Sequence, residues 1–77
     1  MATKKTTLKT ITGAECARLR TKLRLTQAAF WKRVHATQSA GSRYETGRPI
    51  PIQTGILVQM VYGTPEKAAE LLAALRG

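Results

Sequence analysis

Acidic residues are scarce in this 77-residue chain, which has four glutamates and no aspartate against 13 lysines and arginines. The formal charge of +9 predicts a polyanionic partner and is far from typical of a small soluble enzyme. Seven of the basic residues lie between Cys16 and Tyr44 with no acid among them. The charge therefore belongs to one region of the fold, although a nonspecific polyanion binder would have the same composition.

Cysteine, histidine and long apolar runs are equally scarce. A single cysteine, Cys16, excludes an internal disulfide, and with one histidine there is no metal-ligand set, so we expect no metal and a reducing, cytoplasmic compartment. No segment approaches the ~20 apolar residues of a membrane span, and no signal peptide is evident. Enzyme activity and cofactors are not expected either, because the sequence offers no nucleophile and base pair, carboxylate dyad or phosphate-binding loop.

Helical spacing dominates what remains, and no segment alternates as a strand does. "TGAE" predicts a capping box at the start of a first helix that runs to about Arg24. Gly47 and the two prolines that follow should end a third helix at about Thr46. The N-cap candidates of the other helices are Thr26, Thr37 and Thr64. The predicted fold class is all-α, a compact bundle of four or five helices over residues 12–77, preceded by a flexible basic arm over residues 1–11.

Apolar residues at helical spacing predict the buried faces of these helices. The predicted core residues are Cys16, Leu19 and Leu23 in the first helix, Phe30, Trp31 and Val34 in the second, Ile52, Ile56, Leu57, Met60 and Val61 in the fourth, and Ala68, Leu71, Leu72 and Leu75 in the fifth.

The second and third helices are short, are joined by about three residues and are followed by a glycine-terminated loop. Residues 26–46 are therefore predicted to form a helix-turn-helix. The seven basic residues between Cys16 and Tyr44, which no acidic residue offsets, lie within this motif or in the helix before it. This placement indicates a DNA-binding protein.

From about Cys16 to Gly63 the sequence resembles the phage Cro and repressor type of helix-turn-helix, also called the Xre family. The motifs that carry the resemblance are "LTQ" at the start of the second helix and "RYETG" at the end of the third. The resemblance implies a fold of the lambda-repressor-like DNA-binding type. It also implies that residues 38–46 form the recognition helix that enters the major groove.

The resemblance assigns DNA-binding roles to two groups of residues. The base-edge candidates are Gln38, Ser39, Ser42 and Arg43, whose side chains suit adenine, guanine or several acceptors. The phosphate candidates are Thr26, Gln27, Thr37, Arg48, Lys32 and Arg33. Phosphate binding alone would also explain Arg43, and a solvated face explains Lys32 and Arg33 equally well.

Four further residues have predicted structural roles. In relatives, an arginine of the first helix pairs with the glutamate of the "RYETG" motif, which implies an ion pair between Arg20 and Glu45. Trp31 stands where relatives carry alanine, and Gly41 where they carry a branched apolar residue. These two departures would conserve volume if the indole lay over Gly41. His35 replaces a glycine in the turn, at a position where a positive φ would be mildly strained for a histidine.

These observations predict a sequence-specific transcriptional regulator of a bacterium or phage, acting as a repressor on a palindromic operator. Its partners would be double-stranded DNA and a second copy of the chain, contacted through Leu71, Leu72 and Leu75, although a terminal helix covering its own core would look the same. Two alternatives stay open. One is an antitoxin that binds DNA and a partner toxin, and the other is a nonspecific nucleic-acid-binding protein.

Overall fold

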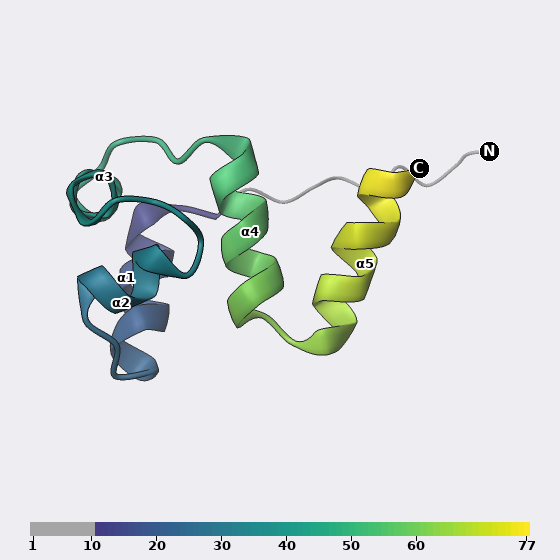
Figure 1. Ribbon diagram of the computed structural model, residues 1–77, viewed down its shortest axis with the longest axis horizontal. Coiled ribbons are helices and arrows are strands. Elements are labelled where there is room, and N and C mark those ends of the chain that lie inside the picture. The colour runs from purple at the N-terminus through teal and green to yellow at the C-terminus, as the bar shows by residue number, and fades with distance from the viewer. Residues whose placement is uncertain (1–10) are drawn as a thin grey trace.

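The computed structural model describes residues 11–77, and the part of the predicted arm that covers residues 1–10 lies outside them. Five helices make up the described chain, which contains no strand. They are α1 (Gly13–Lys22), α2 (Gln27–Lys32), α3 (Gln38–Glu45), α4 (Ile52–Tyr62) and α5 (Pro65–Arg76). The predicted all-α fold is therefore confirmed. Figure 1 shows α1 and α2 beneath α3 at one end of the molecule, with α4 in the middle and α5 at the other end.

Side-chain caps explain where four of the helices begin. The Thr12 hydroxyl accepts a hydrogen bond from the Glu15 amide at 3.1 Å, and the Glu15 carboxylate accepts one from the Thr12 amide at 2.9 Å. This is the expected capping box, and it satisfies two backbone donors that the first turn leaves free. The threonine caps of the other three helices are present as well. They are Thr26, Thr37 and Thr64, each accepting from the amide three residues later.

Left-handed residues close the first three helices. Arg24 has φ 60°, His35 has φ 61° and Gly47 has φ 125°. At each of them the chain makes the paired backbone hydrogen bonds of a Schellman motif, such as Leu25 to Arg20 and Arg24 to Thr21 at 3.0 Å. The predicted end of the first helix at Arg24 was wrong by two residues. No glycine marks this turn, so no stop signal for the helix could be read there.

The core lies where α1, α2 and α4 meet. Five side chains form its buried cluster: Cys16, Phe30, Trp31, Val34 and Val58. Val58 is fully buried and was missing from the predicted core. Six residues of the predicted stripes are instead substantially exposed: Leu23, Ile52, Leu57, Val61, Leu72 and Leu75. Most of them lie on α4 and α5. Because α4 is apolar almost all round, spacing alone could not show which of its faces is buried.

The α4–α5 hairpin is fastened to the rest of the domain by Tyr62. Its hydroxyl donates to the carbonyl oxygen of Phe30 at 2.7 Å, and the two rings stack with centroids 4.3 Å apart. Burial, partly offset by the charge of Arg33, raises the pKa of this phenol. Within residues 11–77 no helix is long and apolar enough to cross a membrane.

Candidate nucleic-acid interface

One side of α3 is an exposed surface of polar and small residues, and its other side packs against the rest of the domain. Ser39 and Arg43 lie one turn apart, and both are exposed. Gln38 and Ser42 form a second pair one turn apart, in which Gln38 is exposed and Ser42 is half-buried. Gly41 is buried on the opposite side. Because the side chains between Gln38 and Arg43 are small, the backbone of α3 can approach another surface closely.

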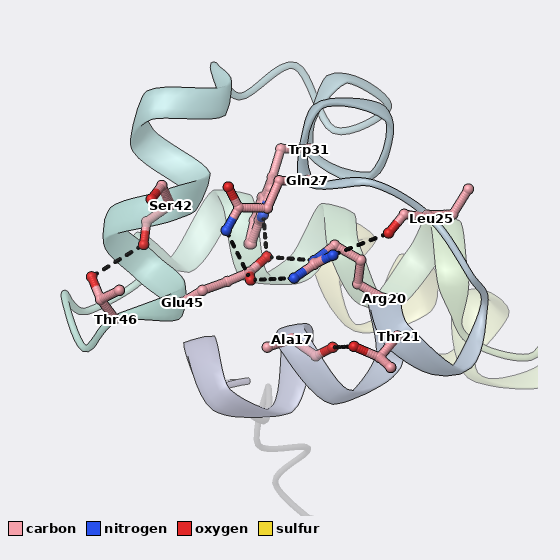
Figure 2. Close-up of polar contacts among 9 residues, drawn as sticks. All are labelled: Ala17, Arg20, Thr21, Leu25, Gln27, Trp31, Ser42, Glu45 and Thr46. Carbon is pink, nitrogen blue, oxygen red and sulfur yellow. Dashed lines mark hydrogen bonds and ion pairs between the residues drawn. The ribbon is translucent and has the colours of Figure 1, made fainter.

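Glu45 at the end of α3 joins three helices. Its Oε2 atom accepts hydrogen bonds from Arg20 Nε at 2.9 Å and Trp31 Nε1 at 2.8 Å. Its Oε1 atom accepts from Arg20 Nη2 at 2.9 Å and Gln27 Nε2 at 3.1 Å. Figure 2 shows these donors converging on the carboxylate from α1 and α2. The pairing of Arg20 with Glu45 that the resemblance implied is thus present, with two further donors that it did not indicate.

This geometry controls the charge of the buried carboxylate. The Glu45 side chain is 6% exposed. Burial raises the pKa of this carboxyl, but the hydrogen bonds from Arg20, Trp31 and Gln27 outweigh it, so that the pKa of Glu45 falls below its ordinary value. The hydrogen bond to Glu45 raises the pKa of Arg20. Both groups are therefore charged at neutral pH, and the pair is an ionic cross-link.

Trp31 occupies the space beside Gly41. A Cβ atom added at Gly41 would overlap the indole atoms Cδ1, Cγ and Nε1. The indole is fully buried, stands edge-on to Phe30 with centroids 5.0 Å apart, and is tilted against Tyr44 at 5.4 Å. The indole of Trp31 on α2 therefore fills the space that the absent side chain of Gly41 on α3 leaves. The sizes of these two residues predicted this fit.

The phosphate candidates fall into two groups. Thr26, Thr37 and Arg48 are exposed, and the two threonine hydroxyls cap α2 and α3. Gln27 is half-buried and directs one side-chain N–H to Glu45, which leaves its second N–H for another acceptor. Arg48 lines a groove of about 570 Å³ between the start of α1 and the connection from α3 to α4. Thr26 and Gln27 lie at the N-terminal end of α2, Thr37 lies at the N-terminal end of α3, and Arg48 follows the C-terminal end of α3.

Lys32 and Arg33 are not brought together with that group. Both are exposed at the C-terminal end of α2. The charge of Arg33 acts on Tyr62, which places it at the C-terminal end of α4, whereas Arg48 lies just before the N-terminal end of that helix. Arg33 and Arg48 therefore lie near opposite ends of α4, a helix about 16 Å long.

Besides the hydrogen bond from Gln27 to Glu45, two structural contacts were not predicted from the sequence. The indole N–H of Trp31 reaches Glu45, a contact that requires a tryptophan at a position where no motif predicts one. Gly13 lies against the backbone carbonyl of Tyr44, so that a Cβ atom there would overlap the carbonyl oxygen. The only sign of this contact in the sequence was a glycine next to the N-cap residue of α1. Glycine is common at helix N-termini, so it did not indicate a close approach of the two backbones.

Comparison with known families supports this geometry. The family described as the RsaL-like HTH domain matches residues 17–61, more than half of the chain and the whole of α2, α3 and the turn between them. The match shows a helix-turn-helix DNA-binding domain, and not the Cro and repressor type in particular. No curated protein and no solved structure matches the chain.

Proposed function

Because the chain belongs to the RsaL-like helix-turn-helix family, we propose that it is a sequence-specific transcriptional regulator that inserts α3 into the major groove of its operator. The observation that carries this proposal is the exposed face of α3, with Gln38, Ser39 and Arg43 on a helix whose opposite side is fixed by Trp31 and Glu45. Gln can pair with adenine, and Arg with guanine O6 and N7, in that groove. In this proposal the bound protein acts as a repressor by occupying the operator.

Selection from random duplex DNA at two salt concentrations tests this function. A regulator should enrich a palindromic consensus whose half-sites lie about 34 Å apart, or a multiple of that distance. A protein that binds only through its +9 charge should show a steep loss of affinity with salt and no consensus. The second outcome would replace the proposal with nonspecific binding.

Arg43 should carry sequence information, and Arg33 should not. Replacing Arg43 with alanine is expected to cost about 1–3 kcal/mol of discrimination at one base pair, because a bidentate contact to guanine would be lost. Arg33→Ala removes the same charge from the far end of α2 and should leave base preference unchanged. The measurement is the affinity of each variant for the selected site and its single-base mutants. Equal losses on every sequence for Arg43→Ala would mean that it binds phosphate only.

We propose further that the regulator is a homodimer through the α4–α5 hairpin. Of the three leucines first predicted for this surface, Leu71 is 4% exposed and belongs to the protein's own interior. Leu72 and Leu75 are 45% and 50% exposed, and Leu57 and Val61 are exposed on α4. Helical spacing puts Leu57 and Val61 on one face of α4, and Leu72 and Leu75 on one face of α5.

The charges of α5 favour a second copy as the partner. Glu66 lies in its first turn and Arg76 in its last. In an isologous, antiparallel pairing of two α5 helices, Glu66 of each would face Arg76 of the other, with Lys67 one residue further along the helix. Leu72 lies near the middle of α5 and would meet its symmetry mate at the two-fold axis.

Charging this surface should therefore dissociate the dimer. Leu72→Glu is expected to yield a monomer in sedimentation analysis and to lower the affinity for a full palindrome much more than for a half-site. Leu23→Glu is the matched control, because Leu23 is similarly exposed, at 44%, but lies in the turn after α1. A wild-type chain that sediments as a monomer at micromolar concentration and occupies the operator as one would contradict the dimer.

A further inference from the structure

Trp31 is the most rigid of the three residues that hold Glu45. Its ring is fully buried and is enclosed by Phe30, Tyr44 and the backbone of Gly41. The Arg20 side chain is 22% exposed and reaches Glu45 over a long flexible stem. The indole N–H is therefore the donor whose position is set by packing, and its 2.8 Å hydrogen bond fixes the rotation of the carboxylate.

The rotation of the carboxylate in turn decides how the Gln27 amide lies. Because an ionised carboxylate only accepts hydrogen bonds, the amide must turn its nitrogen toward Glu45, as the 3.1 Å contact shows. Gln27 is the first residue of α2, is half-buried and contacts Glu45, the last residue of α3. Its second N–H is then held at the surface where the resemblance places a DNA phosphate.

We propose that Trp31 is a positioning residue for DNA binding, whose fixed indole N–H orients the Gln27 amide toward a phosphate by holding the Glu45 carboxylate between them. This inference rests on the proposed function. It concerns a contact that the Cro and repressor type of the resemblance would not make, because alanine stands there at the position of Trp31 and has no such donor.

The test removes the N–H and keeps the shape of the ring. A chain of 77 residues can be assembled by chemical ligation with benzothienylalanine at position 31, in which sulfur replaces the indole N–H. Trp31→Phe is the genetically encoded version, and Val58→Ala is the control, because Val58 is buried in the same cluster on a helix that does not hold Glu45. All variants are compared below their unfolding temperatures.

Two readouts decide the inference. In nitrogen–proton NMR spectra, the side-chain amide signals of Gln27 should shift when position 31 lacks the N–H, and should stay in place in Val58→Ala. On the selected operator, Gln27→Ala should weaken binding by at least about threefold less in the chain with benzothienylalanine than in the wild-type background, because coupled residues are not additive.

Unchanged Gln27 signals in the benzothienylalanine chain would overturn the inference, and so would additive losses of operator affinity. The NMR result does not depend on DNA. A failure of the DNA selection would therefore count against the proposed function, whereas an unmoved Gln27 amide would count against the role of Trp31 alone.

Discussion

Gly41→Ile is expected to destabilise the domain by about 3 kcal/mol, at the upper end of what overpacking a core costs. Even the first carbon of the new side chain would overlap the Trp31 indole, and that ring cannot retreat between Phe30 and Tyr44. The higher helix propensity of isoleucine returns only about 0.5 kcal/mol. Urea denaturation followed by circular dichroism measures the difference.

Gly55 provides the matched control for this prediction, because it is a second buried glycine within a helix. A Cβ atom at Gly55 would meet Ile11 at 3.4 Å and Ile50 at 3.8 Å, which are ordinary contacts. Gly55→Ala should therefore stabilise the domain by about 0.5–1 kcal/mol, whereas Gly41→Ala should destabilise it. Equal signs for the two alanine variants would contradict the proposed fit.

A rescue experiment separates steric conflict from a general intolerance of position 41. Combining Gly41→Ile with Trp31→Ala restores the residue sizes of the family that the sequence resembles. The double variant loses the Trp31 hydrogen bond to Glu45, so it should recover only part of the lost stability. A double variant whose losses simply add would mean that the two residues do not share one space.

Local chemistry made the helix boundaries predictable. Threonine caps and a proline at the first position of α5 act within one helical turn, so Thr12, Thr26, Thr37 and Thr64 could be read directly from the sequence. Arg24 shows the limit of this reading, because a non-glycine residue in the left-handed conformation ends α1 without a composition signal.

Tertiary contacts were predictable only where a motif encoded them. The "RYETG" motif was enough to place Glu45 against Arg20, and the exchange of sizes at positions 31 and 41 suggested where the indole lies. The burial of Val58 and the exposure of Leu57 could not be read from the sequence, since both are branched apolar residues on an apolar helix. Which of them is buried depends on how the α4–α5 hairpin sits against α2, a long-range contact made by Tyr62.

Removing the Glu45 carboxylate should have the other large effect, because Glu45→Ala would leave four N–H donors of three residues without their acceptor. Arg20 would keep only its 3.1 Å hydrogen bond to the Leu25 carbonyl, and the Trp31 N–H is buried beyond the reach of water. Breaking a buried pair by removing one partner costs about 3–5 kcal/mol. We therefore expect Glu45→Ala to unfold at a much lower temperature than the wild type. Glu70→Ala, at an exposed position of α5, should change stability by less than about 0.5 kcal/mol.

The same carboxylate should make the domain sensitive to acid. The pKa of Glu45 is lower in the folded chain than the ordinary value of 4.5, so the folded state favours the ionised form. The stability it contributes is complete above that ordinary value and is lost as pH falls through the lower, folded pKa. Between pH 5 and pH 3, urea titrations should therefore show a steeper loss of stability for the wild type than for a Glu45→Gln chain that still folds. Parallel pH profiles for the two proteins would show that the cross-link formed by Arg20, Gln27, Trp31 and Glu45 does not contribute its charge to folding.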